Sequence, residues 1–152
     1  MLAQLHPGIV HFPIALLTVG FLFDVASLFS SRLPFRQMGA TLLVLGLAMA
    51  GLAVLTGDQA MDAAEHAGVK AQIIEPHEES ATATLFIFLG ALIMRILLLK
   101  RRWVWLWRGY LVVALIGVIM VLRTGYLGGQ LVFEHGIAVK PTVTTAPTPP
   151  RR

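Results

Sequence analysis

Residues 5–18 read LHPGIVHFPIALLT and place two histidines and two prolines at the start of a strongly apolar segment. Proline is tolerated in the first turn of a helix, so Pro7 predicts that a helix begins here. Ala15 and Thr18 follow His11 at helical spacings of four and seven residues and therefore share its face. A histidine at the mouth of an apolar helix, with small side chains beneath it, leaves room for a flat or bulky ligand.

The chain as a whole has the composition of a membrane protein. Of its 152 residues, 57% are hydrophobic and 13% are charged, whereas a soluble domain carries about 25% charged residues. A membrane-spanning helix needs about 20 apolar residues, and the chain has four such stretches, at about 9–29, 38–57, 81–99 and 106–127. We therefore predict an all-α four-helix transmembrane bundle within residues 1–140, followed by a Pro/Thr-rich tail at 141–152.

The distribution of charge predicts how the bundle is oriented. Six basic residues lie in the connections after the first and third stretches: Arg32, Arg36, Lys100, Arg101, Arg102 and Arg108. Seven of the eight acidic residues follow the second and fourth stretches. By the positive-inside rule the basic connections are cytoplasmic, which places both termini outside the cytoplasm. The segment before the first stretch lacks a basic region, so we expect this stretch to be retained and not cleaved as a signal peptide. This one-sided charge favours a lipid bilayer as the partner and not nucleic acid.

All five histidines fall on the predicted outer side of the membrane: His6, His11, His66, His77 and His135. Histidine is common at wet interfaces, but clustered histidines also mark metal or cofactor sites. The chain has no cysteine, which excludes thiolate metal sites, iron–sulfur clusters and c-type haem attachment.

An internal repeat relates the two halves of the chain. His11-x3-Ala15-x2-Thr18 matches His77-x3-Ala81-x2-Thr84, Thr56-Gly57 matches Thr124-Gly125, and Glu65-His66 matches Glu134-His135. We predict two pseudo-symmetric helical hairpins about an axis along the membrane normal. His11 would then be equivalent to His77, and His66 to His135. Histidines that face each other across such an axis are suited to ligate one or two b-type haems.

Asp24, Arg95 and Arg123 lie within the apolar stretches and need partners. Asp24 and Arg95 lie at similar depths in the first and third stretches, and lone charges at such depth usually pair. A structural ion pair is the simpler interpretation and a proton path the alternative. Arg123, near the outer end of the fourth stretch, suits either a lipid headgroup or a carboxylate such as a haem propionate.

At LHPGIVHFPIALL, FLFDVASL and GGQLVFEHGIAV the chain resembles a bacterial family of small membrane proteins, the domain of unknown function 2231. The resemblance extends to about residue 140 through the motifs HPxxVHFPIAL and GGxLVxxHGxxV. It implies a four-helix domain of the bacterial inner membrane, and it implies no activity. The termini, which the charge distribution places outside, would then be periplasmic. His6, His11, His77 and His135 match the family's motifs, whereas His66 lies outside them.

Three functions are compatible with these features. The first is electron transfer by a b-type cytochrome whose haem lies near the periplasmic face, with a quinol or a periplasmic cytochrome as its redox partner. The second is a copper or zinc site built from His6, His11, His77 and His135. The third is a cofactor-free accessory subunit of a larger respiratory or photosynthetic complex, or of a homo-oligomer. In each case we expect an electron carrier or a subunit and not a stand-alone catalyst.

Overall fold

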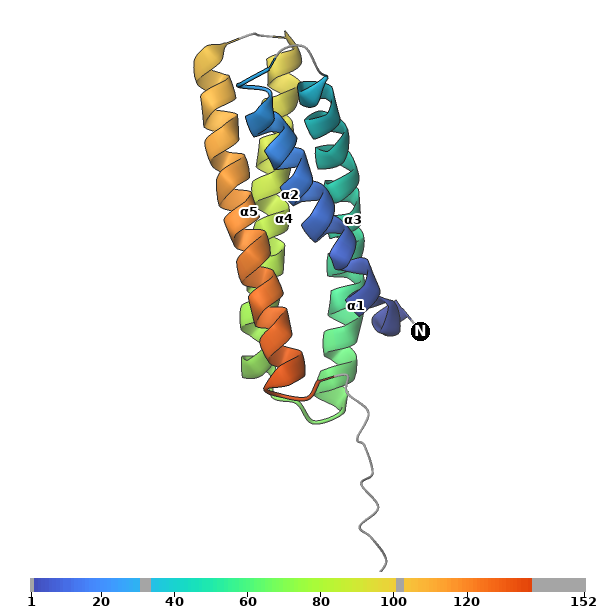
Figure 1. The fold of residues 1–152 in the computed structure, drawn as a ribbon. Coiled ribbons are helices and arrows are strands. Elements are labelled where there is room, and N and C mark those ends of the chain that lie inside the picture. Colours follow the sequence, from blue (N-terminus) through green and yellow to red (C-terminus); the bar gives the residue numbers. More distant parts are fainter. Residues whose placement is uncertain (1, 31–33, 101–102, 138–152) are drawn as a thin grey trace, which may run out of the picture.

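The computed structural model describes residues 2–30, 34–100 and 103–137, and every element in this part of the chain is a helix (Figure 1). A 3-10 turn, η1 (Leu2–Leu5), leads into two consecutive helices, α1 (His6–Ile9) and α2 (His11–Ala26). Three long helices follow: α3 (Phe35–His66), α4 (Ala71–Lys100) and α5 (Val104–Phe133). The four spans that are long and apolar enough to cross a membrane are Ala3–Ala26, Phe35–His66, Ala71–Lys100 and Val104–Phe133. The predicted fold class is therefore confirmed.

The helix ends differ from the predicted ones because hydropathy alone cannot find them. α3 continues nine residues beyond its apolar stretch, and α4 begins ten residues before its own, so the predicted polar loop is reduced to residues 67–70. The extensions are rich in Ala, Glu, Gln and Met, which favour helix in water as well as in lipid. The first span ends at Ala26 and not near residue 29. The predicted tail at 141–152, as well as Arg32, Arg101 and Arg102, lies outside the described residues.

A constant offset of 71 residues relates the buried positions of the two hairpins, α2–α3 and α4–α5. The buried residues Pro13, Leu17, Gly20 and Asp24 of α2 are each followed 71 positions later by a buried residue of α4: Thr84, Phe88, Ala91 and Arg95. The same offset relates Gly39, Leu43, Gly46 and Ala50 of α3 to Tyr110, Ala114, Gly117 and Val121 of α5. The two pseudo-symmetric hairpins expected from the sequence are thus present. Their register is 71, however, whereas the histidine motif predicted 66.

Equivalent glycines allow the helices of each hairpin to approach closely. A Cβ atom at Gly46 would lie 2.7 Å from Leu17 Cδ2, and one at Gly117 would lie 2.8 Å from Phe88 Cε2. Small residues serve this purpose in membrane helices, because packing and not hydrophobicity drives their association. The close approach fixes the depth at which each residue of α2 and α4 faces its partner helix.

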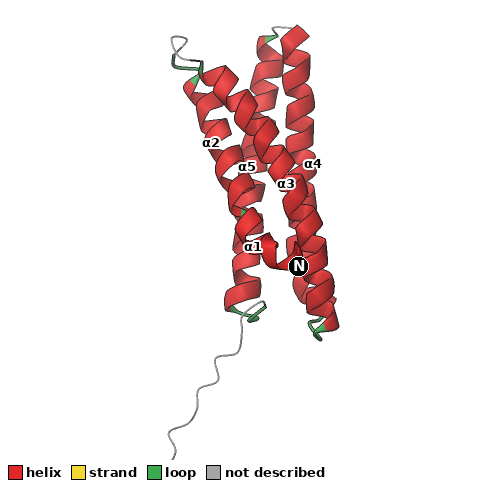
Figure 2. Ribbon diagram, turned by 90° about the vertical axis from the view of Figure 1, so that its right-hand side faces the viewer, coloured by secondary structure: helices red, strands yellow, loops and turns green. Residues whose placement is uncertain are grey.

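The N-terminal segment, η1 and α1, lies beside α3 at one end of the bundle. Figure 2 shows α1 against the lower part of the bundle, near the end where the turn at residues 67–70 joins α3 to α4. In that turn Gly68 has φ +93°, a conformation that glycine adopts at little cost. The last turns of α2 and α4 lie at the opposite end (Figure 1).

Candidate functional site

The register of 71 places His6 and His77, which are 71 positions apart, at equivalent positions of the two hairpins, and the structure brings them together. Their ring centroids lie 6.3 Å from each other and their planes are nearly perpendicular, at 84°. His6 is the first residue of α1, and His77 lies in the second turn of α4. Both side chains are partly buried. The two imidazoles therefore face each other across the pseudo-twofold axis, which is the role that the sequence assigned to His11 and His77.

Each imidazole of this pair rests on a glycine of the neighbouring helix. A Cβ atom at Gly57 of α3 would lie 3.1 Å from His6 Cε1, and one at Gly128 of α5 would lie 3.1 Å from His77 Cε1. These two glycines are again 71 positions apart. Because any side chain at either position would press on the ring, both glycines determine where the imidazoles lie.

Hydrogen bonds set the tautomer of both rings. Nδ1 of His77 lies 3.1 Å from the carbonyl oxygen of Thr124, which can only accept, so this nitrogen carries the proton. Nδ1 of His6 lies 3.2 Å from Thr56 Oγ1. That hydroxyl gives its single proton to the Leu52 or Ala53 carbonyl, at 2.9 and 3.1 Å, and therefore accepts from His6. In both neutral imidazoles the lone pair is then on Nε2.

A cluster of hydroxyl groups holds α4 against α5 beside His77. Thr124 Oγ1 lies 2.8 Å from Ser80 Oγ and 3.2 Å from Thr84 Oγ1. Thr84 in turn donates to the Ser80 carbonyl at 2.7 Å. The equivalent positions of the first hairpin are Ile9, Pro13 and Ala53. The pair is thus symmetric in its imidazoles and asymmetric in its polar surroundings.

His135 shares a pocket with His77, and three other predicted residues are exposed. His77 and His135 line one pocket of about 270 Å³, together with Gln72 and Gln130. His66 is exposed at the end of α3, where Nδ1 lies 2.6 Å from the Asp62 carbonyl. His11 is exposed at the start of α2, and Arg123 is exposed on α5. Among the described residues, no three His, Asp or Glu side chains are grouped as metal ligands.

Asp24 and Arg95 form the second polar centre, at the opposite end of the bundle. Eighteen residues separate Asp24 from His6, which corresponds to about 27 Å of helix. Arg95 Nη1 lies 2.7 Å from Asp24 Oδ1, and Tyr110 donates to Oδ2 at 2.5 Å. Arg95 Nη2 also donates to the Arg36 carbonyl. The ion pair expected from the sequence is therefore present, and Asp24, which is fully buried, has partners on both oxygens.

Several residues of the histidine site were not found from the sequence, although a signal for them exists. His6, Gly46 and Gly57 are spaced by 40 and 11 residues, and His77, Gly117 and Gly128 repeat both spacings. Matching His and Gly together would have given the register of 71. The repeat pairs Thr56 with Thr124 at a spacing of 68 residues. That spacing does not predict their contacts with the histidines, because these contacts depend on how the helices turn toward each other.

Four apolar helices in two equivalent hairpins, with a histidine pair at one end and an ion pair at the other, define a small polytopic membrane protein. The chain belongs to the family described as "Predicted membrane protein (DUF2231)", which matches residues 3–141. No curated protein and no solved structure matches the chain.

Proposed function

We propose that this protein transfers electrons in the bacterial inner membrane and that His6 and His77 would hold one b-type haem. The observation that supports this most strongly is the tautomer of the pair. Each neutral imidazole has its proton on Nδ1, which leaves the lone pair of Nε2 available to a metal ion. In metal sites the ligating histidine typically donates its other N–H to a carbonyl or hydroxyl in this way.

The spacing of the two rings fits a single metal ion between them. Metal–nitrogen bonds of about 2.0–2.1 Å, with each ring nitrogen about 1.2 Å from its centroid, would give a centroid separation of about 6.4–6.6 Å. The separation found between His6 and His77 is 6.3 Å. The donor set is also suitable, because a macrocycle supplies four nitrogens and needs only two from the protein. A structural zinc ion requires four protein ligands, and no such group occurs among the described residues.

The chain's own residues would hold and orient the group. Thr56 and the Thr124 carbonyl fix the tautomers, and Gly57 and Gly128 allow each imidazole to lie close to its helix. When bound, the haem would accept and release one electron at a time. Arg36, Lys100 and Arg108 lie at the opposite end of the bundle, so the positive-inside rule favours a periplasmic face here and periplasmic termini. A quinol or a periplasmic cytochrome is the corresponding redox partner.

A copper site at the same pair is the second candidate. It rests on the same two neutral imidazoles and on the pocket that His77 shares with His135. Neutral imidazole is a good ligand for copper. Haem and copper differ in their absorbance and in metal content, so one preparation distinguishes them.

The first experiment is an absorbance spectrum of the detergent-purified protein from haem-replete cells, as isolated and after dithionite. Haem b ligated by two histidines gives a Soret band and sharp α and β bands on reduction. His6→Ala and His77→Ala should each abolish the low-spin spectrum, whereas His11→Ala and His66→Ala are matched controls that should retain it. A normal spectrum in His6→Ala would overturn the proposal. Copper without haem would select the second candidate. A preparation that contains neither haem nor copper would favour a cofactor-free accessory subunit.

A further inference from the structure

The two imidazoles of the histidine pair are carried by parts of the chain that are held very differently. His77 lies within α4, which is one continuous helix from Ala71 to Lys100. Ile74 and Ser80, three residues before and after His77, are buried, with 2% and 1% of their surface exposed. The helix is therefore anchored in the bundle on both sides of His77.

His6 lies in a short N-terminal segment, residues 2–9, which comprises η1 and α1 and which we call the N-terminal arm. None of residues 3–9 is buried. The arm packs against α3, and α1 also contacts α2, so that the arm lies on the outside of the bundle (Figure 1). Segments with little buried surface open locally at a low free-energy cost. We therefore expect the arm to be held less firmly than α4.

The helical path is interrupted where the arm joins the bundle. Val10 is the single residue between α1 and α2. Pro13 has no N–H, so it cannot donate to the Ile9 carbonyl four residues before it. The first turn of α2 also has no side-chain cap. A helix bends most readily where a proline removes such a hydrogen bond, which places a hinge for the arm at Val10.

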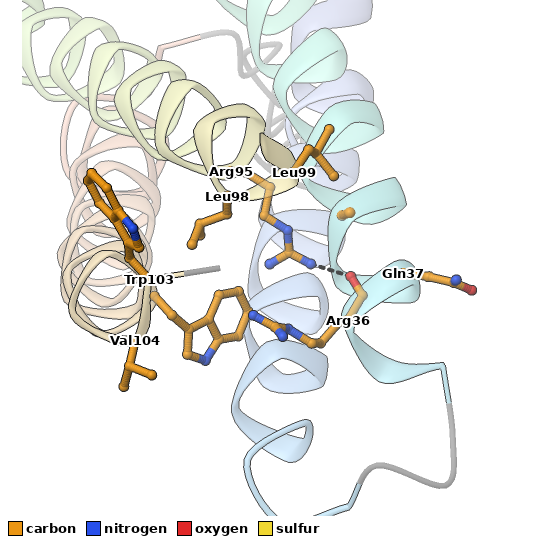
Figure 3. A pocket seen from close by; sticks show the side chains of 9 residues that line it. Arg36, Gln37, Arg95, Leu98, Leu99, Trp103 and Val104 are labelled. Atoms are coloured by element: carbon orange, nitrogen blue, oxygen red, sulfur yellow. Dashed lines mark hydrogen bonds between the residues drawn. The ribbon is translucent and has the colours of Figure 1, made fainter. Parts of the chain in front are cut away.

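One side-chain hydrogen bond ties the arm to the long helices among the described residues: His6 Nδ1 lies 3.2 Å from Thr56 Oγ1 of α3. The opposite end of the bundle is tied more firmly, beside a pocket of about 490 Å³ (Figure 3). There Arg95 of α4 donates to the Asp24 carboxylate of α2 and to the Arg36 carbonyl of α3. Breaking one neutral hydrogen bond costs far less than breaking a buried ion pair. The arm is thus the part of the histidine end that can move.

Entry of a haem between the two rings requires such a movement. In the bound state each imidazole nitrogen would lie about 2.0–2.1 Å from the metal, but before a bond forms it must stay about 3.5 Å from the macrocycle. The rings must therefore lie roughly 3 Å further apart during entry than afterwards. Their centroid separation of 6.3 Å is already as short as in the bound state. Because α4 is anchored, the displacement falls to His6.

We propose that the N-terminal arm delivers one of the two ligands. The arm moves away from α3 about Val10, which separates the imidazoles and opens the site, and it returns to place His6 opposite His77. The inference rests on the proposed function for the identity of the ligand, and on the packing of the arm for its movement.

The test uses a spin label on the arm. The chain has no cysteine, so Gln4→Cys, at an exposed position, gives the full-length protein one site for a nitroxide. The EPR spectrum of the cofactor-free protein in detergent should contain a mobile and an immobile component. Gly57→Ala should raise the ratio of mobile to immobile about fivefold or more, the effect of overpacking, because its Cβ atom would lie 3.1 Å from His6 Cε1. Gly128→Ala is the matched control, because its Cβ atom would lie 3.1 Å from Cε1 of His77, on the anchored helix.

Gly8→Ala should have the opposite effect. A Cβ atom there meets nothing within 4 Å, so alanine fits the docked arm and restricts the backbone of the open one. The ratio of mobile to immobile should fall about two- to fivefold. Addition of haem to the labelled protein without a glycine substitution should remove the mobile component.

Three results would overturn the proposal. A single immobile component in every variant would mean that the arm does not open. Equal responses to Gly57→Ala and Gly128→Ala would mean that the label reports loosening of the whole bundle. Haem binding that leaves the mobile component unchanged would mean that the arm does not deliver His6.

Failure of the proposed function gives a different result. The absorbance spectrum would then show no haem, while the glycine variants, measured in the cofactor-free protein, still decide whether the arm moves. Should Gly57→Ala not fold, Gly8→Ala remains as a test, and an unchanged ratio in that variant counts against the hinge.

Discussion

The two ends of the bundle use the same register in opposite ways. At one end, equivalent positions carry the same residue, His6 and His77. At the other, equivalent positions carry opposite charges, Asp24 and Arg95. Two imidazoles with lone pairs on Nε2 cannot satisfy each other, because neither has a proton to donate there. A carboxylate and a guanidinium can, since one accepts what the other donates.

We interpret this difference as the difference between a proposed binding site, at the histidine pair, and a structural ion pair. Under the proposed function, a metal ion held by the symmetric end would accept the lone pairs of both rings. The asymmetric end is complete within the protein, because Asp24 receives Arg95 on one oxygen and Tyr110 on the other. We therefore assign stability to Asp24 and Arg95, and ligand binding to His6 and His77.

Breaking the ion pair should have the largest effect. Asp24→Asn leaves the Arg95 guanidinium buried without its counter-ion, and removal of one member of a buried pair costs about 3–5 kcal/mol. His6→Ala, at the symmetric end, should cost much less in the cofactor-free protein. Thermal unfolding in detergent compares the two variants. A double variant, Asp24→Asn with Arg95→Gln, should recover part of the loss. Equal costs for Asp24→Asn and His6→Ala would remove the distinction between the two ends.

The glycine contacts that set the register give a second test. Gly117→Ala places a methyl group 2.8 Å from Phe88 Cε2, so the two helices must move apart. Overpacking of this kind costs about 1–3 kcal/mol. Gly125→Ala, two turns along the same helix, is the control, because its Cβ atom would meet nothing within 4 Å. The free energies of unfolding of the two variants, taken from unfolding curves in detergent, should differ by that amount. Identical curves would mean that Gly117 is not a point of close approach.

The fold could be predicted from the sequence because it depends on a local property. Each span is an apolar stretch, and a bilayer leaves such stretches no stable alternative to helix. The Asp24–Arg95 pair could be predicted for a similar reason, since two charges at matching depth in lipid must pair. The helix ends of α3 and α4 could not, because helix-favouring residues continue both helices past the apolar stretch.

The histidine pair was assigned incorrectly because its members depend on packing. His6 and His11 lie about 140° apart around a helix, so only one of them can face inward. The choice is made by the contact of α1 with α3 at Gly57 and by the close approach of Leu17 to Gly46. The spacing of histidine, alanine and threonine that suggested His11 predicts neither contact.

Within the histidine end, the two Nδ1 contacts predict unequal responses to loss of a hydroxyl. Thr56→Val removes the hydroxyl that lies 3.2 Å from His6 Nδ1. Loss of such an outer partner lowers metal affinity about 10- to 100-fold. Thr124→Val keeps the carbonyl that accepts from His77, so affinity should change little. Titration of each cofactor-free variant with haem, followed by absorbance, measures the difference. Equal losses would show that the backbone contact does not set the His77 tautomer.

The smallest expected effect distinguishes the two registers directly. In the histidine motif Thr18 matches Thr84, and equal roles would give equal losses of stability on substitution by valine. The structure gives them different roles. Thr84 donates to the Ser80 carbonyl at 2.7 Å, whereas Thr18 Oγ1 is buried without a hydrogen-bond partner in the described part of the chain. Replacing an unsatisfied hydroxyl by a methyl group is neutral or slightly stabilising, while loss of a made bond costs about 1 kcal/mol.

Thr18→Val should therefore melt at or slightly above the temperature of the unmodified protein, and Thr84→Val below it. Both variants replace a hydroxyl by a methyl group within the bundle, so the change in volume is matched. Equal destabilisation would favour the register of 66 and restore His11 as the partner of His77. Unequal melting temperatures in the stated order would support the register of 71, because only that register makes Pro13, and not Thr18, the equivalent of Thr84.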